Sequence, residues 1–327
     1  MNTEGTMEKK RKIKRMAHFQ QLPILIALIA LVAVLSVLTP AFFTPYNMLN
    51  VLQQTSINAI LAMGMTFVVI TGGIDLSIGS IIAFTGIIMG ELMKRNCLSG
   101  IIIVAGLVIG CCLGAVNGFL VSYLRMPPFI ATLGTQSVAK GFALVIADAK
   151  NIAGFPEGFR FFGSAKIAGI IPVQIFIMLG VLAISFYVLR YRMLGRCLYA
   201  IGGNEEATRL SGIHVRHYKF MAYVISGLCA AVAGVILTAK LNAAQPTAGE
   251  GYEMDAVAAA VIGGASLSGG RGGAVGTMIG ALIISVLNNG LTLLNINSYI
   301  QQIVIGVVII LAVLMDIMQQ ANKTSKQ

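Results

Sequence analysis

Long apolar runs are the feature of this 327-residue sequence that most limits the folds open to it. A helix needs about 20 mostly apolar residues to cross the roughly 30 Å hydrocarbon layer of a bilayer, because each residue adds about 1.5 Å. Ten candidate segments lie at about residues 22–38, 49–70, 76–92, 100–122, 129–148, 170–189, 217–238, 254–265, 273–294 and 299–316. The sequence therefore predicts an all-α, polytopic membrane protein with about ten transmembrane helices.

The composition excludes a water-soluble domain. Hydrophobic residues make up 57% of the chain and charged residues 11%, whereas soluble proteins contain about 45–50% and about 25%. The net charge of +11 comes from short segments between the apolar runs, so it indicates membrane topology rather than binding of nucleic acid. The five cysteines form no C-x-x-C pair, and we interpret them as small buried hydrophobic residues.

The distribution of Lys and Arg predicts the orientation in the membrane. With the N-terminus inside, the cytosolic segments contain sixteen of these residues and the outer loops six, in agreement with the positive-inside rule. Both termini are therefore expected in the cytosol. The expected domains are a basic cytosolic tail (1–21), a transmembrane domain (22–316) with a cytosolic loop at 190–216, and a cytosolic C-terminal tail (317–327). The run at 22–38 is interpreted as a retained helix rather than a signal peptide, since no A-x-A cleavage site follows it.

The longest cytosolic loop contains a short predicted helix. Asn204 is a good N-cap, two glutamates follow it at the positive end of the helix dipole, and Gly212 suits the left-handed residue that ends a helix. A helix of about two turns is marginal in water by itself, so the segment is either a solvated loop or a docking element for a cytosolic partner. We favour docking. The candidate docking residues are Gly203, Asn204, Glu205, Glu206, Ala207, Arg209, Leu210, Ser211 and Gly212.

Amide side chains interrupt several apolar segments. Amides in hydrocarbon need partners on neighbouring helices or in a wet cavity, so they either hold helices together or line a path for a hydroxylated, uncharged solute such as a sugar. The candidate pathway residues are Gln53, Gln54, Asn58, Asn288, Asn289, Gln301 and Gln302. Neighbouring residues on a helix point about 100° apart, so at most one of Asn288 and Asn289 is expected to face the path directly.

A glycine-rich break precedes the third apolar segment and contains Gly72, Gly73, Asp75, Ser77 and Gly79. A carboxylate in the bilayer must be paired, be solvated or cap a helix, and we favour capping by Asp75. The pattern G-G-x-x-L-S-x-G of this break recurs at residues 263–270, as a remnant of a repeat or by chance. Lys140 in the fifth segment has no partner that the sequence identifies. His214 and His217 have HxxH spacing without a third ligand, so no metal site is expected.

Several motifs together resemble a known family. Glu206-Ala207-Thr208-x-x-x-Gly212 is similar to the E-A-A-x-x-x-G pattern of ABC importer permeases, with Thr208 replacing the second alanine. Four further motifs occur in a fixed order: TGGIDLSIGS at 71–80, PFIATLG at 128–134, AQPTAG at 244–249 and LNNGL at 287–291. Over about residues 40–316 the chain therefore resembles the ribose-type permeases, the membrane subunits of monosaccharide ABC importers.

The resemblance implies a type II ABC importer-like fold in a bacterial plasma (inner) membrane, with ribose as the favoured sugar. The implied partners are a second permease subunit in a homodimer or heterodimer, a cytosolic ABC ATPase that binds ATP and Mg, and an extracytoplasmic sugar-binding protein. The chain itself has no Gly-Lys dipeptide and so no Walker A loop, which agrees with nucleotide binding on another chain. No cofactor and no enzymatic activity are expected in this chain. The alternatives are an ion-coupled secondary transporter with Asp75 as an ion ligand, and a membrane enzyme, for which no nucleophile–base pair is visible.

Overall fold

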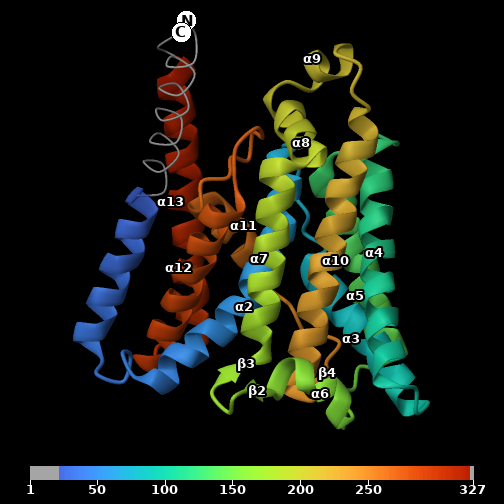
Figure 1. Cartoon of the computed structure of the whole chain (residues 1–327), viewed down its shortest axis with the longest axis vertical. Helices are drawn as coiled ribbons and strands as arrows, with labels where there is room; N and C mark the ends of the chain where they lie inside the picture. The colour runs from blue at the N-terminus through green and yellow to red at the C-terminus, as the bar shows by residue number, and fades with distance from the viewer. Residues whose placement is uncertain (1–21, 325–327) are drawn as a thin grey trace, which may run out of the picture.

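The computed structural model describes residues 22–324 of the chain and is almost entirely helical (Figure 1). A first helix at Leu22–Leu38 is followed by α2 (Pro45–Ile70), α3 (Ile78–Lys94), α4 (Ser99–Ser122), α5 (Pro128–Ile146), α6 (Glu157–Ser164), α7 (Val173–Tyr191), α8 (Met193–Gly203), α9 (Glu205–Leu210), α10 (Val215–Leu241), α11 (Tyr252–Ile262), α12 (Ala274–Leu293) and α13 (Ser298–Thr324). The predicted tail at 1–21 and the last three residues of the predicted C-terminal tail lie outside the described residues.

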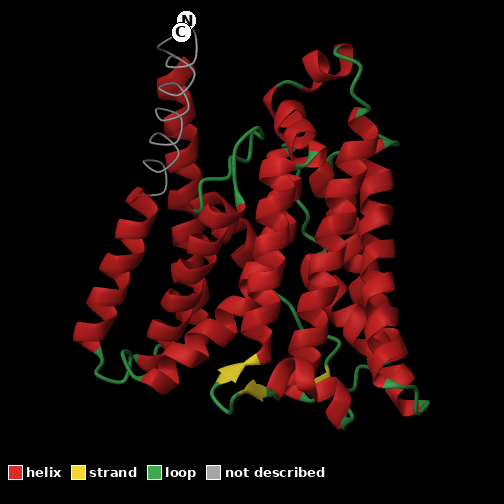
Figure 2. Cartoon of the chain, in the orientation of Figure 1, coloured by secondary structure: helices red, strands yellow, loops and turns green. Residues whose placement is uncertain are grey.

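Two small antiparallel strand pairs lie near one end of the helices (Figure 2). β1 (Ile152–Ala153) pairs with β4 (Ala243–Ala244), and β2 (Lys166–Ile167) pairs with β3 (Ile171–Pro172). The first pair fixes the end of α10 to the connection after α5, and the second closes the connection between α6 and α7. The prediction of an all-α protein is confirmed, with these four two-residue strands as additions.

All ten predicted apolar segments coincide with helices, and seven described helices are long and apolar enough to cross a membrane. These seven are α2, α4, α5, α7, α10, α12 and α13. The first helix and α3 each have 17 residues, and α11 has only 11. The short α11 agrees with the half-helix that the glycine-rich stretch after residue 262 predicts, since non-helical backbone at membrane depth must be covered by protein or line a cavity.

The central helix of the bundle is α2. Within its membrane-spanning window, 89% of the residues are buried, compared with 67% for α10 and 6% for α13. A helix that is apolar on all sides and buried on all sides lies in the interior of a protein. By contrast, α13 exposes large apolar side chains along its length, as expected of a helix that faces lipid or another subunit.

Glycines at every fourth residue of α4 allow its close packing against α10. Gly106, Gly110, Gly114 and Gly118 form one buried stripe. A Cβ added to Gly110 would lie 2.6 Å from the carbonyl oxygen of Gly227 on α10. Small residues at this spacing let two transmembrane helices approach until their backbones touch.

Two segments contain more helix than the sequence predicts. The loop at 190–216 contains two helices rather than one, because Cys197, Leu198 and Ile201 of α8 form a buried apolar face that holds this extra helix against the bundle. The last helix continues to Thr324, beyond the predicted membrane segment at 299–316, and no Gly or Pro follows that segment to break it.

Candidate functional site

The short helix α9 lies at the end of the molecule where α13 also ends (Figure 1). Asn204 caps it as predicted: its side-chain oxygen accepts a hydrogen bond of 2.9 Å from the backbone N–H of Ala207. Gly212, shortly after the helix, has the expected left-handed backbone with φ of +81°. The local sequence therefore determines both ends of this helix.

An apolar side chain is presented outward by α9. Leu210 is 76% exposed, and Ala207, three residues earlier on the same face, is also exposed. Thr208 is the buried residue of the helix and faces the rest of the chain. An exposed leucine on a surface helix of this length is a candidate contact for a partner protein.

One ion pair joins α9 to α10, and a second lies within α9. The Lys219 ammonium of α10 lies 2.9 Å from the Glu205 carboxylate, and Arg209 pairs with Glu206 within the helix. Hydrogen bonds from Arg209 lower the pKa of the Glu206 carboxyl below its ordinary value, so this carboxylate stays charged at neutral pH. The Glu205–Lys219 pair thus joins α9 to α10, whereas Leu210 stays exposed.

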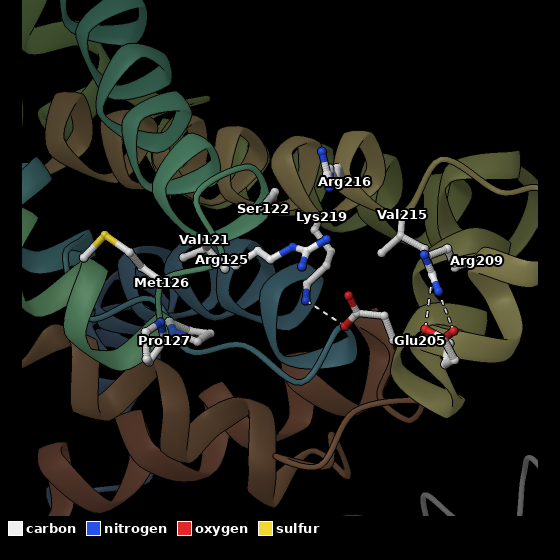
Figure 3. Close-up of a pocket in the computed structure, with 12 residues that line it drawn as sticks. Val121, Ser122, Arg125, Met126, Pro127, Glu205, Arg209, Val215, Arg216 and Lys219 are labelled. Carbon is white, nitrogen blue, oxygen red and sulfur yellow. Dashed lines mark hydrogen bonds and ion pairs between the residues drawn. The ribbon is translucent and has the colours of Figure 1, made fainter.

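A cavity of about 640 Å³ lies beside α9 (Figure 3). Its lining comes from the end of α4, the connection to α5, α9 and the start of α10: Val121, Ser122, Arg125, Met126, Pro127, Pro128, Glu205, Glu206, Arg209, Val215, Arg216 and Lys219. Arg125 and Arg216 form no ion pair with any described residue. The cavity therefore carries unneutralised positive charge next to the exposed leucine.

Three glycine-containing segments meet behind α8. The backbone N–H of Gly270 donates a 2.9 Å hydrogen bond to the carbonyl oxygen of Ile70 at the end of α2. A Cβ at Gly202 would overlap both that oxygen and the Gly270 nitrogen. We name Ile70, Gly202 and Gly270 the glycine junction. It joins three segments: the end of α8 directly before α9, the break after α2, and the loop between α11 and α12. The two copies of the G-G-x-x-L-S-x-G pattern therefore lie side by side.

The Asp75 carboxylate is fully buried and accepts several hydrogen bonds. It accepts from the Ser77 backbone N–H at 3.1 Å, from the Ser77 hydroxyl at 2.6 Å and from the Ser226 hydroxyl of α10 at 2.8 Å. Asn117 of α4 donates to the Ser77 hydroxyl at 2.7 Å. The N-cap residue of α3 is Ser77 and not Asp75. The Asp75 carboxylate instead stabilises the turn before the helix through its hydrogen bonds from Ser77, and its hydrogen bond from Ser226 joins this turn to α10. Gly72, Gly73 and Gly79 belong to the same break, with φ of +78° at Gly72.

The amides at 288 and 289 have different partners. Asn289 and Asn47 exchange two hydrogen bonds of 2.9 Å, which hold α12 against α2. Asn288 is half-buried and donates to the Asp255 carboxylate of α11 at 3.5 Å, while its side-chain oxygen has no described partner. The two neighbours therefore point to different surroundings, as the helical geometry predicts.

The remaining candidate amides are spread along the bundle. Asn58 is buried and donates to the Ser285 hydroxyl at 3.3 Å, and Gln53 and Gln54 are half-buried on α2. Gln301 donates to the carbonyl oxygen of Ile296 at 2.8 Å, in the connection between α12 and α13, whereas Gln302 is exposed. None of the seven predicted pathway residues lines the cavity beside α9.

Sequence reasoning missed the partner of Lys140. Its ammonium lies 3.2 Å from the carboxylate of Glu250, in the segment between β4 and α11. The two residues are separated by 110 positions in the sequence. The sequence shows a lysine inside an apolar segment, which indicates a functional position. It does not indicate which acidic residue pairs with this lysine.

Comparison with known proteins identifies the class. Residues 47–313 match the family described as branched-chain amino acid transport system / permease component. The chain therefore belongs to this family of permeases. It is a multi-pass membrane protein and a non-catalytic, transmembrane component of a transport system.

Its relatives include sugar permeases. The chain is 48% identical over 296 residues to the ribose import permease protein RbsC of Escherichia coli K12, covering 89% of this chain and 92% of that protein. It is 46% identical over 318 residues to RbsC of Bacillus subtilis 168, covering 97% and 98%. It is 41% identical over 280 residues to the D-allose transport system permease protein AlsC of Escherichia coli K12, covering 84% of each. No solved structure matches the chain significantly.

Proposed function

We propose that this chain is the transmembrane permease subunit of an ATP-driven importer that carries ribose across a bacterial plasma membrane. The observation that carries the proposal is the 48% identity to a ribose import permease over 92% of that protein's length. The lower identity of 41% to an allose permease favours ribose over that hexose. The chain would perform no covalent chemistry and would alternate between outward- and inward-facing states.

The proposed topology has ten spans with both termini in the cytosol, as in type II ABC importers. The helices run alternately up and down in Figure 1, and α9 lies at the same end as the end of α13. The excess of Lys and Arg on that side supports its assignment to the cytosol. The transmembrane domain then covers residues 22–316, and the coupling loop at 190–216 includes α8 and α9.

The proposed energy coupling runs through α9, which would seat in a groove of a cytosolic ATPase. The exposed Leu210 and Ala207 supply an apolar anchor, and the cations beside them can meet carboxylates of the ATPase. The glycine junction supports a route inward, because it links the end of α8 to the helix breaks of the bundle without intervening side chains. ATP and Mg would be bound by this ATPase and not by the present chain.

The proposed translocation pathway uses amides that can both donate and accept hydrogen bonds. Asn58 and Asn288 are the strongest candidates among the seven, because each has a buried side-chain oxygen without a described partner. Asn289 is committed to Asn47 in this conformation, and we assign it the role of holding helices together. A second permease subunit and an extracytoplasmic sugar-binding protein would complete the assembly.

The proposal is tested by uptake of radiolabelled sugars in cells that lack only this chain. We expect loss of ribose uptake, restoration by the wild-type chain, and co-purification of the chain with an ATPase. Loss of allose uptake with ribose uptake intact would contradict the choice of sugar. Uptake that survives ATP depletion but stops with a protonophore would support the ion-coupled secondary transporter instead.

A further inference from the structure

An exposed ion pair lies in the membrane-spanning part of the chain. Lys140 is six residues before the end of α5, which places its Cα about 9 Å from that end. The side chains of Lys140 and Glu250 are 40% and 67% exposed in the single chain. Exposed charges at membrane depth avoid hydrocarbon and face water or another protein surface. This face of α5 is therefore not a lipid-facing surface.

The segment that carries Glu250 enters the bundle from the end where β4 lies. The carbonyl oxygen of Gly249 touches Gly79, near the start of α3, and that glycine lies about 22 Å along the helix from Lys94. Non-helical backbone reaches this depth only where it is covered by protein or lines a water-filled cavity. Residues 245–251 thus have the location of a segment that lines a pathway.

A small cavity lies beside the ion pair. Its lining residues are Gly79, Ser80, Ala83, Gln136, Lys140, Pro246, Thr247, Ala248, Glu250 and Glu253. Its volume is about 20 Å³, which holds about one water molecule. Glu253 is only 7% exposed, and its Oε2 atom has no hydrogen-bond partner among the described residues. A buried carboxylate oxygen without a partner is costly, so it points to a donor that is bound there at another stage.

The chemistry of these groups suits an uncharged, hydroxyl-rich solute. The two glutamates accept hydrogen bonds from hydroxyl groups, the Lys140 ammonium donates to oxygens, and the Gln136 amide does both. The Lys140 ammonium and the Glu250 carboxylate neutralise each other, so this pair favours neither a cation nor an anion. A monosaccharide offers neighbouring hydroxyls that can bond to several of these groups at once.

We propose that Gln136, Lys140, Glu250 and Glu253 form a sugar-binding station of the translocation pathway, which the Lys140–Glu250 pair closes in the present conformation. The sugar enters when this pair separates, because the present cavity of about 20 Å³ is too small for it. Its hydroxyls then replace the contact between the two charges. This inference rests on the proposed sugar transport and specifies where the sugar binds.

The test of water access is cysteine labelling in the full chain, assembled with its ATPase in membrane vesicles. Gln136→Cys and Lys140→Cys are treated with a charged methanethiosulfonate, and the wild-type chain gives the background from the native cysteines. Val138→Cys is the matched control, since it lies between them on α5 and is 56% exposed. We expect Gln136→Cys and Lys140→Cys to react about tenfold faster than Val138→Cys, because a charged reagent does not enter hydrocarbon. Ribose should slow both reactions.

The second measurement is the KM for ribose uptake in Lys140→Met and Glu250→Gln. We expect about a tenfold increase in KM for each, since a hydrogen bond to a charged group is lost. The control pair is Glu91→Gln and Lys94→Met at the outer end of α3, whose ion pair is also exposed, and we expect its KM to be unchanged.

Labelling at the rate of Val138→Cys, or an unchanged KM in both Lys140→Met and Glu250→Gln, would overturn the station. Protection of the cysteines by leucine in place of sugars would overturn its sugar chemistry. If the wild-type chain transports no ribose, the proposed substrate fails independently. Protection by another sugar would then still support the station, and protection by none would refute it.

Discussion

Replacing Gly202 by alanine tests whether the glycine junction is a direct backbone contact. The new Cβ would overlap the carbonyl oxygen of Ile70 and the nitrogen of Gly270. Both atoms belong to the backbone, so neither can move aside by changing a rotamer. The substitution must therefore shift the end of α8, the end of α2 or the loop between α11 and α12.

The expected loss of stability follows from two contributions. Overpacking of a close contact typically reduces the free energy of unfolding by about 1–3 kcal/mol. Weakening the 2.9 Å hydrogen bond between Gly270 and Ile70 reduces it by a further 0.5–1.5 kcal/mol or so. The sum of about 1.5–4.5 kcal/mol corresponds to a melting temperature lower by roughly 5 °C. The assay is thermal unfolding of the purified chain in detergent, combined with ribose uptake in cells.

The neighbouring glycine provides the control for stability. A Cβ at Gly203 would have no atom within 4 Å, so Gly203→Ala should melt at the wild-type temperature or slightly above it. If Gly202→Ala also melts at the wild-type temperature, the three segments of the glycine junction are not in direct backbone contact. The proposed route from α9 into the bundle then loses its physical basis.

Three further predictions concern the coupling helix, the buried acid and the topology. Leu210→Asp should reduce ribose uptake about fivefold or more, and far more than Glu205→Ala, without lowering the amount of chain in the membrane; a wild-type rate with the ATPase still bound would show that α9 is only a loop. Asp75→Ala should lower the free energy of unfolding by about 1–3 kcal/mol, because two serine hydroxyls lose their acceptor; an unchanged melting temperature would contradict this. A reporter fused after Gln320 should read as cytosolic, and an extracellular signal would rule out either the even number of spans or the orientation.

The sequence alone determined the features that depend on local physics. Each apolar run of about 20 residues can satisfy its backbone in a bilayer only as a helix, so the positions of the helices followed directly. The ends of α9 were also predictable, since the Asn204 cap and the left-handed Gly212 involve contacts within a few residues. The helix α8 was missed because its short apolar face becomes stable only when it packs against the bundle.

The tertiary structure decided which side chains meet. Nothing local in the sequence connects Lys140 with Glu250, or Asn47 with Asn289, which are 242 residues apart. The local sequence also does not determine the role of a glycine, because glycine suits both a turn and a close backbone contact. Only the atoms around Gly202 in the folded chain show that it makes a close backbone contact. Long-range pairs depend on how the helices pack, and apolar periodicity specifies that a helix forms without specifying which helix lies beside it.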